Sequence, residues 1–343
     1  MARVASSARA LRAAPTTPAR PLRSPSTVGR GCTVEASSGR RIVLPGGSGH
    51  LGTHLARQLV ARGDEVVVLT RGAAGLRDGV RHVRWDGTRL GPWVRTLDGA
   101  DAVVHLAGKR VDAAPTRRNV DELIRSRAGT VRLVGRALAE VATPPPVWVQ
   151  ASTLAIHGDA GDRLLDDDAA PDGLGPRQMT TVALAWEHAF LEATAGVDRR
   201  VLLRLGVSLG GGDPALARLR QLVRLGLGGT IASGRQWVSW LALEDALALF
   251  VRALDDATMS GTYVSTSPNP VTNAELMATL RRHEGRRLGL PAPRAAVHVG
   301  TRLLGTDPAL PLTSRRGVPS RLLAEGFRFG VPHLEEALRR ADA

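Results

Sequence analysis

The chain has 343 residues, which is long enough for one large α/β domain and a smaller second one. Its single cysteine, Cys32, excludes an internal disulfide and suits a reducing cytoplasm, and no apolar run approaches the roughly 20 residues of a membrane span. The net charge of +14 raises the question of nucleic-acid binding.

Residues 1–39 are rich in Ala, Arg, Ser, Pro and Thr without a hydrophobic period, which predicts a disordered basic tail. Residues 1–41 hold eight arginines and one acid, Glu35, which is half of the net charge of +14. Such a leader is also typical of an organelle transit peptide, but a flexible tail or an upstream start codon is the interpretation we prefer. The remaining chain carries no zinc-finger, helix-turn-helix or RNA-binding signature, so we expect neither nucleic acid nor membrane as a partner.

From Arg40 onward, short apolar strands alternate with amphipathic helices. Nearly continuous apolar strands separated by helices predict a parallel sheet buried on both faces, so residues 40–210 should form a doubly wound α/β (Rossmann) fold. The rhythm then loosens, and residues 211–343 should form a smaller α/β substrate lobe over the C-terminal edge of the sheet. The expected strands are 42–44, 65–69, 80–85, 102–106, 147–151, 201–205 and 261–265, and the expected helices are 50–62, 118–142, 178–194, 243–257, 293–304 and 333–340.

A glycine-rich turn joins the first strand to the first helix and has the GxxGxxG spacing of a dinucleotide fingerprint. One glycine allows the tight turn, one lets the backbone approach a pyrophosphate, and one lets the helix pack close to the strand. The alternative is a tight turn in a fold that has lost its cofactor. The predicted cofactor-binding residues here are Gly46, Gly47, Ser48, Gly49, His50, Leu51 and Gly52.

The end of the second strand indicates which nicotinamide cofactor is bound. An NAD site usually places an acid there, whereas an arginine accommodates the 2′-phosphate of NADP. The strand runs into Thr70 and Arg71, and the acid Glu65 stands at its other end. We therefore expect NADP rather than NAD, with Arg71 on the phosphate, although in so arginine-rich a chain Arg71 could be only an exposed charge.

Two further strand ends carry candidate site residues. Leu106, Ala107 and Gly108 would pass beneath the ribose and nicotinamide side of the cofactor, or form only a small-residue turn. After the fifth strand, Ser152 is a cofactor-binding candidate, and Thr153 could hydrogen-bond a substrate carbonyl or alcohol. His157 could serve as acid or base, or be a structural histidine.

Two features limit the chemistry. The acidic loop over 159–172 lacks metal-ligand spacing, so we expect no metal. The chain has one tyrosine, Tyr263, and one lysine, Lys109, so a Tyr-x-x-x-Lys pair cannot be built.

The glycine turn, Leu106–Gly108 and Ser152–Thr153 together resemble an extended short-chain dehydrogenase/reductase. The segments Trp186-Glu187, 203–207, 225–229, 234–237, 239–241 before Glu244-Asp245, 267–273 and 322–327 resemble its NAD(P)-dependent epimerase-like branch, which has a small C-terminal domain of unknown function at about 290–340.

This resemblance implies an NAD(P)-binding sheet and a sugar-nucleotide-like or small carbonyl substrate. It places the superfamily's catalytic tyrosine and lysine at Met179 and Ala183, a pair that this branch generally lacks. His157, Ala242 and Val264 also depart from the tyrosine, histidine and asparagine that members usually have.

Three functional hypotheses remain. The first is an NADP(H)-dependent oxidoreductase or epimerase of unknown substrate, with Thr153 and His157 or a water as polarising and proton-transfer groups. The second is a non-catalytic NADP(H) sensor or scaffold protein, favoured by the lost polar positions. The third, nucleic-acid binding through the basic tail, is the one we favour least.

Overall fold

The computed structural model describes residues 39–171 and 175–342, which belong to one compact unit. The tail predicted over residues 1–39 lies outside this part, Gly39 excepted. Within the described ranges, no helix is long and apolar enough to cross a membrane.

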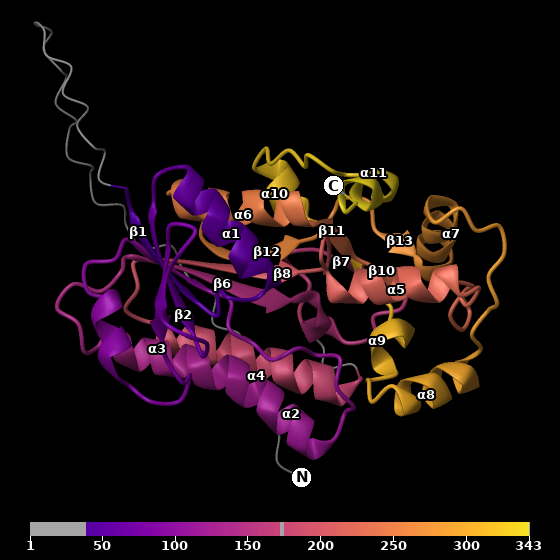
Figure 1. Ribbon diagram of the computed structural model, residues 1–343, viewed down its shortest axis with the longest axis horizontal. Helices are drawn as coiled ribbons and strands as arrows, with labels where there is room; N and C mark the ends of the chain where they lie inside the picture. The colour runs from indigo at the N-terminus through magenta and orange to yellow at the C-terminus, as the bar shows by residue number, and fades with distance from the viewer. Residues whose placement is uncertain (1–38, 172–174, 343) are drawn as a thin grey trace, which may run out of the picture. The chain divides into compact units, whose positions relative to one another are not determined.

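An eight-stranded sheet forms the centre of the fold, in the order β12-β8-β6-β5-β1-β2-β4-β3 (Figure 1). All neighbours are parallel except the edge strand β3, which runs antiparallel to β4. The chain order reverses between β1 and β5, and doubly wound folds bind their ligands at the carboxyl ends of the strands beside such a reversal. The strands are β1 (Arg41–Pro45), β2 (Glu65–Thr70), β3 (Gly75–Arg77), β4 (Val80–Arg84), β5 (Ala102–His105), β6 (Val147–Thr153), β8 (Arg199–Leu205) and β12 (Gly261–Ser265).

Helices cover both faces of this sheet, which confirms the doubly wound prediction (Figure 1). One face carries α1 (His50–Ala61) and α6 (Leu243–Asp255). The opposite face carries α2 (Arg117–Ile124), the π-helical turn η2 (Arg125–Gly129), α3 (Thr130–Leu138) and α4 (Arg177–Ala193).

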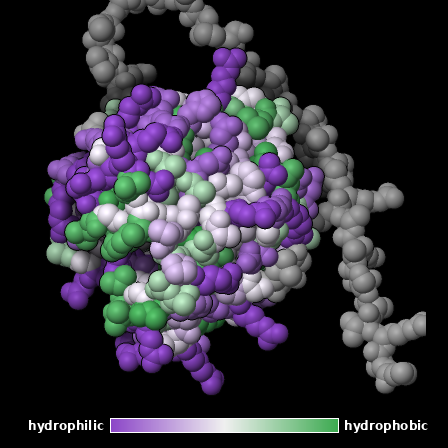
Figure 2. Space-filling model, turned by 90° about the vertical axis from the view of Figure 1, so that its right-hand side faces the viewer, coloured by the Kyte–Doolittle hydropathy of each residue, from purple (hydrophilic) through white to green (hydrophobic). Residues whose placement is uncertain are grey.

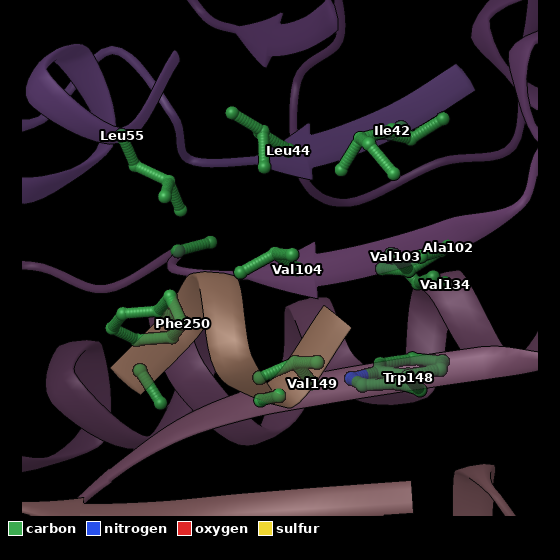
Figure 3. Packing of buried hydrophobic residues seen from close by; sticks show 14 of the residues in the cluster. Ile42, Leu44, Leu55, Ala102, Val103, Val104, Val134, Trp148, Val149 and Phe250 are labelled. Atoms are coloured by element: carbon green, nitrogen blue, oxygen red, sulfur yellow. The ribbon is translucent and has the colours of Figure 1, made fainter. Parts of the chain in front are cut away.

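The main core lies between these layers, and aliphatic side chains dominate it. Figure 3 shows Leu44 of β1 and Val104 of β5 beside Leu55 of α1 and Phe250 of α6, all fully buried. Because both faces of β1 and β5 are covered, their apolar residues form the continuous runs 42–45 and 102–104 rather than an alternating pattern.

The smaller lobe is built from short elements and has its own apolar cluster around Trp240, Met277 and Leu338. Figure 2 shows the side of Figure 1 that carries α5, α7 and α8, where apolar residues lie among polar ones. Three two-stranded sheets, β9–β11, β10–β13 and β7–β14, connect distant segments. The remaining elements are η1 (Pro92–Thr96), η3 (Leu154–His157), β7 (Leu164–Leu165), β9 (Val207–Leu209), α5 (Pro214–Arg224), β10 (Trp237–Val238), β11 (Trp240–Ala242), β13 (Val271–Thr272), α7 (Asn273–His283), α8 (Arg294–Leu303), α9 (Ala309–Leu312), β14 (Arg316–Gly317), α10 (Ser320–Ala324) and α11 (Leu334–Arg340).

The structure differs from the sequence prediction in several places. The helices α5 and α7 and the three two-stranded sheets have no counterpart among the expected elements. The helix expected over 118–142 is interrupted by the turn η2 and ends at Leu138, because the prolines at 144–146 cannot continue a helix. In addition, β12 and α6 come from beyond residue 210 but complete the central sheet and its cover. The division into domains at residue 210 stays a prediction.

Candidate functional site

The glycine loop between β1 and α1 is packed so closely that a side chain is excluded at Gly46, Gly47 and Gly52. Gly46 has φ +80°, and a Cβ there would lie 2.4 Å from the Cα of Ala107. A Cβ on Gly52 would lie 2.5 Å from the Cα of Gly47, so the helix packs directly against the loop. These contacts bring together two of the predicted cofactor segments, the glycine loop and Leu106–Gly108.

Gly49 is different, because the space beside it is open. Its φ is −77°, and the nearest atom to a Cβ there would be the Gly46 carbonyl oxygen at 3.6 Å. Gly49 is the N-cap of α1, no side chain caps the helix, and its first turn holds no acid. The positive end of the helix dipole is therefore available to an anion, and the loop fits a pyrophosphate.

Ser48, His50 and Leu51 extend this loop toward neighbouring elements. The Thr70 hydroxyl at the end of β2 donates to Ser48 Oγ at 3.2 Å, which ties the loop to the second strand. His50 lies close to Gly212, since a Cβ on that glycine would stand 3.7 Å from the ring. Leu51 is half-buried against the main core.

The end of β2 carries the expected arginine. Arg71 follows Thr70 and is exposed, and it forms no hydrogen bond or ion pair within residues 39–171 and 175–342. Glu65, at the opposite end of the strand, pairs with Arg41 at 2.8 Å. At its carboxyl end, β2 is therefore followed by an exposed cation, Arg71, and its carboxylate Glu65 lies at the other end.

The segment after β5 lies against a buried arginine. A Cβ on Gly108 would stand 3.2 Å from the guanidinium carbon of Arg127, a residue of the π-helical turn. Arg127 is 9% exposed, donates to the Lys109 carbonyl at 2.8 Å and stacks on Trp186 at 5.1 Å. Burial lowers the pKa of Arg127 to about 10, so it stays charged at neutral pH.

At the end of β6, the three predicted polar residues have different surroundings. The Ser152 hydroxyl donates to Glu187 Oε1 at 2.6 Å. Thr153 is half-buried and accepts from the Ala155 N–H at 3.2 Å, which caps the short helix η3. His157 is fully buried, and its Nε2 lies 3.5 Å from Nη1 of Arg204. The role of His157 as acid or base stays a prediction, as does that of Thr153.

Sequence reasoning did not identify the ion pair that holds this end of the sheet together. Arg204 on β8 donates to Glu187 on α4 through Nε at 3.0 Å and Nη2 at 2.9 Å. The pair is nearly buried and also contacts Ser152 and His157. Glu187 and Arg204 both lie in segments that carry the family resemblance. The periodicity of a strand or a helix, however, does not predict that two such residues form an ion pair.

The single tyrosine and the single lysine have different partners and do not form a pair. Tyr263 is fully buried on the edge strand β12, and its hydroxyl donates to Glu325 at 3.1 Å. Burial raises the pKa of Tyr263 to about 12. Lys109 forms an ion pair with Glu122 instead. No group of three or more possible metal ligands occurs in the part of the chain that the structure describes.

Comparison with known proteins identifies relatives along almost the whole described chain. The sequence model of the NAD dependent epimerase/dehydratase family matches residues 42–264, and that of a domain of unknown function, DUF1731, matches residues 292–341. The human epimerase family protein SDR39U1 is 31% identical over 304 residues, which cover 87% of this chain and 98% of that protein. The Bacillus subtilis epimerase family protein YfhF is 30% identical over 298 residues, covering 87% of this chain and 96% of that protein.

Solved structures of known proteins also resemble this chain along most of its length. The crystal structure of human SDR39U1 (isoform 2) with NADPH superimposes with a TM-score of 0.76 at 29% identity, covering 88% of this chain and 99% of that one. A nucleoside-diphosphate sugar epimerase from Corynebacterium glutamicum superimposes with a TM-score of 0.70 at 29% identity, over 89% of this chain and 58% of that one.

Proposed function

Because the chain belongs to the NAD dependent epimerase/dehydratase family, we propose that it is an NADPH-dependent oxidoreductase or epimerase acting on a small molecule. The observation that carries this proposal is the glycine loop. Its close contacts at Gly46 and Gly52 and its open space at Gly49 are what a pyrophosphate at a helix N-terminus requires.

The preference for NADPH over NADH rests on the end of β2. Arg71 is exposed and unpaired among the described residues, and Ser48 is held beside the same strand end by Thr70. Human SDR39U1 was crystallised with NADPH, which supports the same choice. The 2′-phosphate would lie against Arg71 and the pyrophosphate against the amides of Gly49 and the first turn of α1.

The bound nicotinamide would supply or accept the hydride. Thr153, at the carboxyl end of β6, would orient a substrate oxygen through its hydroxyl. The Ser152 hydroxyl donates to Glu187, which fixes the carboxyl end of β6. Because Met179 and Ala183 stand where the superfamily has its tyrosine and lysine, the proton would come from His157 or a water.

The alternative is a non-catalytic NADP(H) sensor or scaffold, and it is favoured by the apolar side chains of Met179 and Ala183 and by the complete burial of His157. Consumption of NADPH with a panel of aldehydes, ketones and quinones distinguishes the two. Turnover that Thr153→Val lowers at least about tenfold would support catalysis, whereas cofactor binding without turnover across the panel would favour the sensor. A cytoplasmic location and the absence of a nucleic-acid or membrane partner stay predictions.

A further inference from the structure

The inward face of helix α4 is rich in cations and poor in carboxylates. Met179, Ala183, Trp186 and Glu187 are spaced so that they share one face of this helix. Three guanidinium groups reach that face, and they belong to Arg127, Arg204 and Arg315.

Within the described ranges, only Arg204 among these three arginines forms an ion pair with a carboxylate. Glu187 accepts both hydrogen bonds from Arg204 and a third from Ser152, so its capacity is largely used. Arg127 has no carboxylate partner, and its buried Nη1 has no hydrogen-bond partner among the described residues. Even with Asp159, whose charge acts on Arg315, three guanidinium groups stand against two carboxylates here, which favours an anionic ligand.

Arg315 contacts both the end of the short helix η3 and helix α4. Its Nε donates to the carbonyl of Gly158, the residue that ends η3, at 2.9 Å. Its Nη2 lies 3.2 Å from the sulfur of Met179. The guanidinium thus stands beside the helix position where the family resemblance places the catalytic tyrosine, and at the end of the helix that Thr153 caps.

The backbone around Arg315 holds this position firmly. The Arg315 N–H donates to the Trp237 carbonyl at 3.0 Å, and the Ala160 N–H donates to the Ser314 carbonyl at 2.9 Å. The next two residues form β14, which pairs with β7. A segment from the far end of the chain is therefore fixed against the loop that follows η3.

The charge of Arg315 is retained at this site. Burial lowers its pKa to about 10 while the charge of Asp159 acts in the opposite direction, so the guanidinium is protonated at neutral pH. Asp159 Oδ1 accepts from the Ser314 N–H at 2.9 Å, and no carboxylate in the described ranges forms an ion pair with Arg315. Nη1 of Arg315 makes no hydrogen bond within the same ranges.

We propose that Arg315 binds an oxyanion of the substrate, a carboxylate or a phosphate group, at the carboxyl end of β6. A guanidinium whose Nη1 makes no hydrogen bond within the described ranges is suited to such a group. The inference rests on the proposed function, since it places the substrate of that same site. It assigns the substrate to anionic small molecules and gives the C-terminal segment a direct part in binding it.

The test is anion binding by the protein loaded with NADPH. Oxalate and inorganic phosphate are titrated separately at constant ionic strength, and the fluorescence of the bound nicotinamide and the melting temperature are followed. The wild type should show saturable binding, with the stronger of the two anions identifying the group. Arg315→Met and Arg315→Gln should weaken it about tenfold or more. Arg132→Met removes the same charge at an exposed pair with Glu192 and should leave it unchanged.

Equal binding by the wild type and both Arg315 variants would overturn the inference, as would no saturable binding of either anion to the wild type. Arg315→Gln keeps a donor for the Gly158 carbonyl and serves if Arg315→Met does not fold. If NADPH itself fails to bind, the proposed function is contradicted. In that case the anions are titrated without cofactor, and the rise in melting temperature that they cause is measured. Loss of this rise in Arg315→Gln still supports the inference, and an unchanged rise overturns it.

Discussion

Glu187 and Arg204 face each other at the carboxyl end of the sheet and are joined by two hydrogen bonds of 2.9 and 3.0 Å. Their side chains are only 12% and 9% exposed, so each charge depends on the other for its solvation. Removing one partner of such a pair leaves a buried charge without compensation.

Glu187→Ala should therefore lower the free energy of unfolding by about 3–5 kcal/mol, measured by urea denaturation. Glu192→Ala provides the matched control, because its pair with Arg132 is about half exposed and should contribute at most about 1 kcal/mol. Similar losses in the two variants would show that the Glu187–Arg204 pair is not the structural support that its burial indicates.

Substitutions in the glycine loop should separate cofactor binding from folding. Gly49→Val places side-chain atoms in the open space beside the loop, where the pyrophosphate would lie, so NADPH binding should be lost with a nearly unchanged melting temperature. Gly52→Ala instead forces a Cβ to within 2.5 Å of Gly47 and should lower the melting temperature. Retained NADPH affinity in folded Gly49→Val would refute the assignment of the loop.

Arg71→Glu should weaken NADPH binding far more than NADH binding, because only NADPH carries the 2′-phosphate. The expected loss for NADPH is at least about tenfold, and the melting temperature should not change, since Arg71 has no partner in the described chain. Arg77→Glu changes the charge equally on the nearby strand β3 and serves as control. If both affinities barely move, Arg71 is only an exposed charge.

His105 should make the protein less stable in mild acid. It is fully buried on β5 against Trp148, and burial lowers its pKa to about 3. The unfolded chain, with a pKa near 6.5, binds the proton that the folded state excludes. The contribution of the neutral ring is complete above about pH 6.5 and is lost progressively as the pH falls toward 3.

Urea denaturation at pH 7.5, 6 and 5 measures this loss, which His105→Phe should reduce relative to the wild type. The exposed His298 provides the control, since His298→Gln should leave the acid dependence as it is. An equal acid dependence in the wild type and His105→Phe would show that other groups control it.

Sequence reasoning predicted those parts of the molecule that local periodicity determines. The apolar runs 65–69 and 102–106 became β2 and β5, and the glycine spacing predicted a loop whose contact with Ala107 the structure shows. Strands of two or three residues, such as β7 and β14, were missed because they are too short to have a period. Their pairing depends on tertiary contacts.

The contacts around the candidate site could not be predicted from local sequence patterns either, because they join residues that lie far apart in the chain. The Arg315 guanidinium reaches Met179 across 136 residues of sequence, and the partners Glu187 and Arg204 come from a helix and a strand that the sheet order brings together. In a chain with 46 basic residues, no local pattern distinguishes these arginines from exposed ones.

The most direct test of the account is an equilibrium titration of the purified protein with NADPH and with NADH, following nicotinamide fluorescence. We expect saturable NADPH binding that is at least about tenfold tighter than NADH binding, because the glycine loop would bind the pyrophosphate and Arg71 the 2′-phosphate. Failure of both cofactors to bind would contradict the account and turn attention to a scaffold that has lost its cofactor.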